Sequence, residues 1–133
     1  MLFDNVSKTK EQGNMGVGMA IAYFTLKSYT VSVPLTDSQE YDLVVDIEGS
    51  LKKVQVKTSN RKTTNGGYEV SLRSSGGNKT SHTYKKFDTS EVDYVFILLG
   101  DKRMFFIPTS KMNSKSTLTI GNSNIYEEYM VRI

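Results

Sequence analysis

Three polar side chains on two neighbouring strand-like runs have the types and spacing for metal-assisted phosphodiester chemistry. Asp42 stands in the first run, Gln55 and Lys57 stand in the second, and residues 48–50 lie between the runs. A two-residue turn there sets Asp42 opposite Gln55 or Lys57 on one face of a hairpin. Cross-strand partners lie about 5 Å apart and diagonal neighbours about 7–8 Å. A carboxylate and an amide can then share one hydrated cation with an ammonium beside them.

The elements that must position these side chains follow from apolar patterning. Helical spacing of apolar residues predicts a helix over residues 11–28, buried on most sides. The most apolar run, residues 92–99, is followed by a second apolar run and predicts a central hairpin. We therefore expect strands at residues 29–33, 41–47, 54–57, 68–72, 92–99 and 103–107, a helical turn at 109–112, and a final strand around 125–132. These elements predict an α/β fold with a mixed central β-sheet flanked by helices.

Composition limits the class of protein and the kind of metal site. With 133 residues, 38% of them apolar, the chain is expected to form a single domain spanning residues 1–133. It has no apolar run of membrane-spanning length and no secretion signal, so we expect a soluble, cytoplasmic protein. Cysteine is absent and His82 is the single histidine. Disulfides, thiolate catalysis and histidine- or cysteine-rich zinc sites are excluded, and any metal must be held by oxygen.

Positive charge is concentrated in residues 52–86. This stretch has nine Lys and Arg residues against one acid, Glu69, which gives it a net charge of +8 in a chain whose total is +3. Such a stretch favours a phosphate-rich partner, because each neutralised phosphate releases condensed counterions. A solvated basic loop is the alternative interpretation of the same charges.

Several short segments form an ordered pattern between about residue 9 and residue 108. They are Gly13-Asn14-Met15-Gly16, Tyr41-Asp42-Leu43-Val44-Val45-Asp46, Val54-Gln55-Val56-Lys57-Thr58, Val92-Asp93-Tyr94 and Ile107-Pro108. With these segments the chain resembles the PD-(D/E)xK nucleases, which have a restriction-endonuclease-like core. The variant it is most similar to has glutamine in the middle acidic position, as in the group I intron-encoded homing endonuclease type. An ordered match is more specific than the short motif alone.

The resemblance implies a role for each residue of the hairpin. Asp42 would be the principal ligand of Mg²⁺ or Mn²⁺, Gln55 would offer a neutral carbonyl oxygen, and the backbone carbonyl of Val56 would supply a third oxygen. Lys57 would position the attacking water or stabilise charge on the pentavalent phosphate. Without the resemblance, the ordinary interpretation is a surface amide beside an exposed Asp42–Lys57 ion pair worth about 0.2–1 kcal/mol.

One position departs from the family pattern. Relatives have a helix glutamate after the Gly-x-x-Gly segment, whereas Val17 stands there in this chain. Glu11 lies six residues earlier, about 240° around a helix, and could join the site only if the first helical turn were not helical. Otherwise it is an acid near a helix N-terminus, where acids are favourable. Val17 fits a natural loss of activity, a substitution that traps an intact complex, or a site that works with fewer carboxylates.

The resemblance also implies a double-stranded DNA partner. Arg61 and Arg73 are our preferred base readers, because a two-stranded ribbon from residues 59–78 fits the major groove. The DNA-contacting candidates are Arg61, Lys62, Arg73, Ser74, Ser75, Lys79, Lys85 and Lys86. A long recognition site implies a homodimer or homotetramer. The alternatives are a catalytically silent DNA-binding protein of this fold, a Holliday-junction-resolving or restriction-type nuclease, and a structural protein without a nucleic-acid role.

Overall fold

A mixed six-stranded sheet forms the centre of the computed structural model, which describes residues 1–4, 9–75, 84–85, 87–122 and 125–133. Its strand order is β1-β2-β3-β7-β8-β10, and only the β3–β7 pair is parallel. The longest strand, β3, therefore sits inside the sheet and links its two antiparallel halves. The strands are β1 (Thr30–Ser32), β2 (Leu43–Ile47), β3 (Ser50–Ser59), β7 (Tyr94–Leu99), β8 (Met104–Pro108) and β10 (Met130–Val131).

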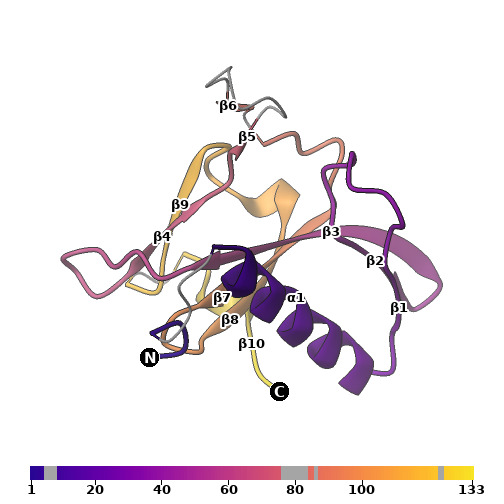
Figure 1. Cartoon of the computed structure of the whole chain (residues 1–133), viewed down its shortest axis with the longest axis horizontal. Coiled ribbons are helices and arrows are strands. Elements are labelled where there is room, and N and C mark those ends of the chain that lie inside the picture. The colour runs from indigo at the N-terminus through magenta and orange to yellow at the C-terminus, as the bar shows by residue number, and fades with distance from the viewer. Residues whose placement is uncertain (5–8, 76–83, 86, 123–124) are drawn as a thin grey trace.

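Helix α1 (Thr9–Leu26) covers one face of this sheet (Figure 1). Its buried side includes Ala20, Tyr23 and Phe24, and Phe24 makes an edge contact with Phe96 of β7. A Cβ atom on Gly16 would approach the Thr58 methyl group to 2.5 Å, so glycine allows the helix to lie close against β3. The first turns of the helix are thereby fixed beside the last residues of β3.

A two-stranded ribbon covers the opposite face of the sheet. Strands β4 (Tyr68–Ser71) and β9 (Thr117–Ile120) pair antiparallel, although 45 residues separate them in the chain. Alternate residues of the ribbon are buried in one cluster with Val95 and Ile97 of β7. The short strands β5 (Ser74–Ser75) and β6 (Tyr84–Lys85) pair with each other, and the 3₁₀ turns η1 (Thr109–Lys111) and η2 (Glu127–Tyr129) follow β8 and precede β10.

The expected α/β class with a mixed sheet is confirmed, with differences in how it is covered. Within the described residues α1 is the one α-helix, and the β4–β9 ribbon takes the place of helices on the second face. The helix begins and ends two residues earlier than predicted. The predicted final strand over residues 125–132 is wrong for most of its length, because η2 occupies part of it and only β10 remains extended.

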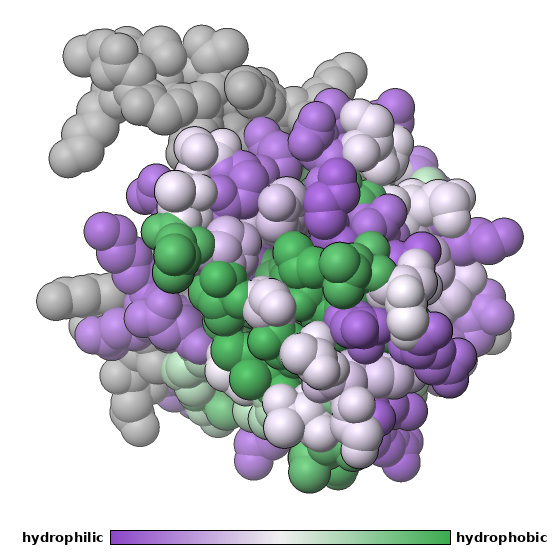
Figure 2. Space-filling view, turned by 90° about the vertical axis from the view of Figure 1, so that its right-hand side faces the viewer, coloured by the Kyte–Doolittle hydropathy of each residue, from purple (hydrophilic) through white to green (hydrophobic). Residues whose placement is uncertain are grey.

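Apolar side chains are exposed at the β1 end of the sheet. Leu26 at the end of α1, Val33 and Leu35 after β1, and Leu51 at the start of β3 are all more than half exposed, and Leu35 is fully exposed. Figure 2 shows an apolar patch with a hydrophilic border on this side, which is the right-hand side of Figure 1. Within the described ranges, no helix combines the length and apolar character needed to cross a membrane.

Candidate active site

The β2–β3 hairpin sets the register of the candidate site. Its turn is Glu48-Gly49, with φ of 52° and 90°, and Ile47 pairs with Ser50 across it. Positive φ at both central residues is the turn geometry that matches the twist of two antiparallel strands. The pairing ends at Leu43 and Val54, and Asp42 stands one residue before this last pair, beside Val54 and Val56 of β3. Of the two turns compatible with the sequence, the structure forms the first.

Asp42 is held against β3 by its backbone and its side chain. Its N–H donates to the Val54 carbonyl at 2.9 Å, and its Oδ2 accepts from the Val56 N–H at 2.7 Å. In a strand the N–H and C=O of one residue point to the same side, so the Val56 carbonyl also faces the edge where Asp42 lies. Although Asp42 is exposed, desolvation raises its pKa above the usual value, opposed by the Val56 N–H and by Lys57.

Gln55 is the one buried amide in the hairpin. Its side chain is 8% exposed, and its Oε1 has no hydrogen-bond partner within the described residues. A buried oxygen left without a partner costs about 1–3 kcal/mol. Beside a carboxylate and a backbone carbonyl, that oxygen completes a set of hard ligands of the kind that Mg²⁺ or Mn²⁺ takes. The residues present therefore fit a divalent cation.

Lys57 lies on the same strand face as Gln55, because successive side chains of a strand alternate. It is half-buried, and desolvation lowers the pKa of its ammonium while the Asp42 and Glu40 carboxylates oppose that shift. Glu40 was not among the predicted site residues, because residues 36–40 look like a polar loop. The signal that could have found it is its acidic side chain two residues before Asp42.

The acids near this site are few. Among the described residues, no three His, Cys, Asp or Glu side chains come close enough together to hold a metal by themselves. Glu11 is exposed in the first turn of α1, which is helical from Thr9, so the condition for its joining the site is not met. Val17 is partly buried and packs against the apolar cluster between α1 and the sheet. The structure thus brings Asp42, Gln55, Lys57 and Glu40 together, without Glu11.

Asp93 fixes β3 to its parallel neighbour. Its Oδ2 accepts from the Lys53 N–H at 2.8 Å, and its own N–H donates to the Lys53 carbonyl at 2.9 Å. The Thr109 hydroxyl and N–H in turn donate to backbone carbonyls of Val92 and Asp93. This network holds the strand that carries Gln55 and Lys57 in register with β7.

A polar groove begins at the end of strand β3. It has a volume of about 750 Å³ and lies between the start of α1, the end of β3 and the β4–β9 ribbon. Gln12 donates to the Thr58 hydroxyl at 2.9 Å and closes one side of it. Its lining is Thr9, Gln12, Thr58, Ser59, Asn60, Arg61, Glu69, Ser71, Arg73 and Thr117. The groove is thus lined by charged, hydroxyl and amide side chains, and Thr58 and Ser59 in its lining directly follow Lys57 on β3.

The predicted DNA-contacting residues fall into three groups. Arg61 and Arg73 are exposed and line the groove, and Lys62 is exposed beside it in the segment that leads to β4. Ser74 and Ser75 form β5 and Lys85 lies in β6, but the structure describes only their backbone. Lys79 and Lys86 lie outside the described residues. Of the eight candidates, the structure therefore brings Arg61 and Arg73 into one groove with the end of β3.

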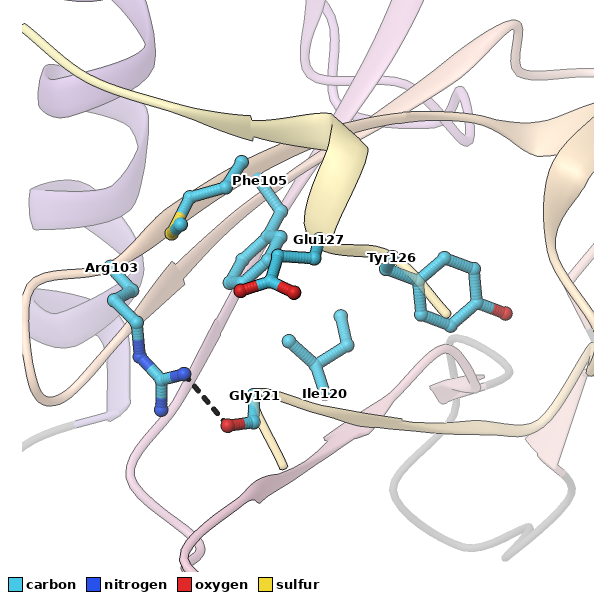
Figure 3. Close-up of a pocket in the computed structure, with 7 residues that line it drawn as sticks. Arg103, Phe105, Ile120, Gly121, Tyr126 and Glu127 are labelled. Carbon is cyan, nitrogen blue, oxygen red and sulfur yellow. Dashed lines mark hydrogen bonds between the residues drawn. The ribbon is translucent and has the colours of Figure 1, made fainter. Parts of the chain in front are cut away.

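A second, much smaller cavity lies under the C-terminal tail and has a structural role. Its volume is about 30 Å³, room for about one water molecule. Figure 3 shows Arg103 reaching from the β7–β8 turn to the Gly121 carbonyl, which it contacts at 2.8 Å, with Tyr126 and Glu127 on the tail. Asp101 holds the same guanidinium at 2.7 Å. These contacts tie the end of β9 to the sheet.

The charge on Asp42 predicts a dependence of stability on pH in the metal-free protein. Because the folded state raises this pKa, it binds the proton more tightly than the unfolded chain does, and ionisation above that pKa costs stability. Asp42→Asn keeps an oxygen for the Val56 N–H and removes the charge. We expect its melting temperature at pH 7 to rise by about 1–2 °C, a small effect because the group is exposed. Thermal unfolding in a chelator measures this.

The same measurement at lower pH is the control. As the pH falls through the raised pKa, the wild-type carboxyl takes up its proton and the two proteins are expected to converge. A variant that melts lower than the wild type at pH 7 would contradict a net cost of the Asp42 charge.

Comparison with known proteins agrees with this geometry. The model of the family described as PD-(D/E)XK endonuclease matches residues 7–131. Protein 5.3 of Escherichia phage T7 is 29% identical over 107 residues, 80% of this chain and 86% of the phage protein. The bacterial homing endonuclease I-Ssp6803I has a similar structure, with a TM-score of 0.76 and 26% identity over 89% of this chain and 81% of that enzyme. The chain therefore belongs to the PD-(D/E)XK endonuclease family.

Proposed function

We propose that this protein is a metal-dependent endonuclease that binds double-stranded DNA and hydrolyses it at specific sites, as a homing endonuclease does. The observation that carries the proposal is the hairpin, where the Asp42 carboxylate binds the Val56 N–H between Lys57 and Gln55, whose side-chain oxygen has no partner among the described residues. The similarity to a bacterial homing endonuclease supports the substrate class. Incubation of plasmid DNA with the protein and Mg²⁺, beside a chelator control, tests it.

Asp42, Gln55 and the Val56 carbonyl would hold the divalent cation. When bound, such an ion polarises the scissile phosphate and lowers the pKa of a water molecule. The Val56 N–H keeps the Asp42 carboxylate oriented through its 2.7 Å hydrogen bond. Gln55 brings no charge, so cation binding before DNA arrives is expected to be weaker than in relatives with a second carboxylate.

Lys57 would act directly on the reacting groups. Its half-buried ammonium can donate to the attacking water or to a phosphate oxygen that gains charge in the transition state. Burial makes these interactions stronger than they would be in bulk water. Glu40 and Asp42 keep the ammonium charged against the cost of desolvation.

Phosphate contacts along the groove would supply most of the DNA affinity. Lys62 is exposed beside the groove and is expected to contact a phosphate, so Lys62→Ala should weaken binding equally for all sequences. The slope of log affinity against log salt concentration should fall in magnitude by about 0.9. Fluorescence anisotropy at several salt concentrations measures both effects.

Lys27→Ala is the matched control for that variant. Lys27 follows the end of α1 opposite to the groove, about 27 Å away along an 18-residue helix, and it is also exposed. Its salt slope should equal that of the wild type. If both variants change the slope equally, the groove is not the DNA surface.

A catalytically silent DNA-binding protein of the same fold is the alternative that the structure favours next. Val17 packs into the apolar cluster where relatives have an acid, so the site has fewer carboxylates. If Val17 stands in the glutamate position, Val17→Glu should add a ligand charge and raise cleavage with Mg²⁺ by about tenfold or more. A plasmid cleavage assay measures the change.

Val17→Gln is the control for that experiment, because glutamine has nearly the same size as glutamate and carries no charge. It should leave cleavage at the wild-type level and should carry the same packing cost. Unchanged activity in a folded Val17→Glu protein would argue against the alignment at this position.

We also propose that the protein assembles as a homodimer or homotetramer. A domain of this size covers only part of a long recognition site, and a symmetric assembly doubles its reach. The tail residues Tyr126, Tyr129 and Met130 pack against the protein's own core, whereas the exposed apolar side chains beside β1 are available to a second copy. Light scattering of the purified protein gives the mass that tests this assembly.

A further inference from the structure

Glu69 is the one acid in the basic stretch of residues 52–86, and the structure places it in the polar groove. Strand β4 alternates, with Tyr68 and Val70 buried and the side chain of Glu69 turned to the other face. A carboxylate facing phosphates would repel them and weaken binding. In a DNA groove this carboxylate can instead accept hydrogen bonds, from a protein side chain and from an amino group on a base edge.

The outer face of the β4–β9 ribbon has the form and chemistry for base readout. Ser71 and Thr117 lie opposite each other on this face, and Thr119 lies opposite Glu69. All three hydroxyl side chains are exposed, while the inner face of the ribbon is buried in the core. A two-stranded antiparallel ribbon of this kind fits the major groove, where the edges of bases are displayed.

Arg61 stands beside Glu69 at the mouth of the groove. Its Nε lies 3.3 Å from a Glu69 carboxylate oxygen, and the two side chains are 81% and 43% exposed. Their neighbouring backbones are also joined, since the Glu69 N–H donates to the Arg61 carbonyl. The two side chains therefore form an exposed ion pair, and among the described residues the other guanidinium N–H groups and the second carboxylate oxygen have no partner and can meet a ligand.

We propose that Glu69 and Arg61 read one C·G base pair in the major groove. The N4 amino group of cytosine donates to Glu69, and Arg61 donates to O6 and N7 of the paired guanine. Glu69 is then a specificity residue, because its charge disfavours every base edge that offers only acceptors. This inference rests on the proposed DNA-binding function and adds the identity of one base pair.

Selection of bound duplexes from a randomised library, in a chelator so that no DNA is cut, tests the pair. The wild type should select cytosine at one position by about tenfold over the other bases. Glu69→Ala should lose that preference and bind unselected DNA more tightly. Glu69→Gln should shift the preference to adenine, whose N6 and N7 match an amide.

Glu48→Gln is the matched control. This variant also loses one negative charge, but at the β2–β3 turn, about 33 Å along β3 from the groove. It should select the same DNA site as the wild type. Both Glu69 variants keep the backbone hydrogen bonds of Glu69, and equal melting temperatures would confirm that they fold.

The outcomes separate this inference from the proposed function. If the wild type binds duplex DNA and both Glu69 variants select the same site as it does, the inference is overturned and the endonuclease proposal stands. If the wild type binds duplex DNA without any base preference, the inference is overturned together with the site-specific part of the proposed function, and only the nuclease activity is left standing. If the wild type shows no salt-dependent duplex binding, the DNA-binding function itself is overturned, and the inference falls with it.

Discussion

Lys57→Ala is expected to lower the single-turnover rate of Mg²⁺-supported DNA cleavage by about 10²- to 10³-fold. The ammonium lies on the strand face that carries Gln55, within electrostatic reach of the Asp42 carboxylate, where it can stabilise charge that develops only in the transition state. Duplex affinity should change little, because the contacts along the groove remain. Cleavage of a labelled duplex with enzyme in excess gives the rate, and anisotropy gives the affinity.

Lys52→Ala is the matched control for this variant. Lys52 lies on the same strand five residues away, pairs with Val45 near the hairpin turn, and points to the opposite face. The Lys52→Ala variant also loses one positive charge from β3, and it should cleave DNA at nearly the wild-type rate. Equal losses in the two variants, or full activity in Lys57→Ala, would remove Lys57 from the reaction.

Gln55→Glu is expected to reduce the Mg²⁺ concentration needed for half-maximal cleavage by about tenfold. The change puts a second carboxylate next to Val56, whose N–H binds the Asp42 carboxylate, and affinity for a hard cation rises with ligand charge. Without metal the two carboxylates repel each other at neutral pH, so the variant should melt lower in a chelator. The rise in melting temperature on adding Mg²⁺ should therefore be larger than in the wild type.

Gln55→Leu provides the opposite change with a side chain of similar size. It removes the orphaned oxygen and should melt higher than the wild type in a chelator, because no buried polar atom is left without a partner. Its response to Mg²⁺ should be weaker. If both variants respond to Mg²⁺ as the wild type does, Gln55 is not a ligand.

The hairpin that carries the site could be predicted from the sequence because two signals agree there. Residues 48–50 offer only two short turns, and the alternation of apolar residues in 41–47 fixes which side chains face the core. The structure adds the turn actually formed and the hydrogen bonds that hold Asp42 to β3. The central hairpin of β7 and β8 was predictable for a similar reason, because both strands are apolar throughout.

The β4–β9 ribbon could not be predicted, although β4 itself was. Strand β9 is only four residues long, and its alternation of Thr and Leu or Ile lies in a weakly patterned tail. Pairing across 45 residues leaves no local signal such as a turn. The sequence predicted a two-stranded ribbon within residues 59–78, whereas the structure pairs β4 with the distant strand β9.

Two further differences have local causes. Glu40 lies close enough to Lys57 to act on its charge, although it stands three residues before β2 in a polar run that looks like a loop in the sequence. The tail is not one strand, because η2 turns the chain within three residues and buries Tyr126 just before it. In each case the contact that decides the conformation comes from another part of the fold.

Cleavage of supercoiled plasmid in Mg²⁺, compared with the same mixture in a chelator, tests the central claim most directly. The wild type is predicted to convert the plasmid to nicked or linear form with Mg²⁺ and to leave it intact in the chelator. A folded wild-type protein that binds the plasmid with a steep salt dependence but leaves it intact at every Mg²⁺ and Mn²⁺ concentration would contradict the endonuclease proposal.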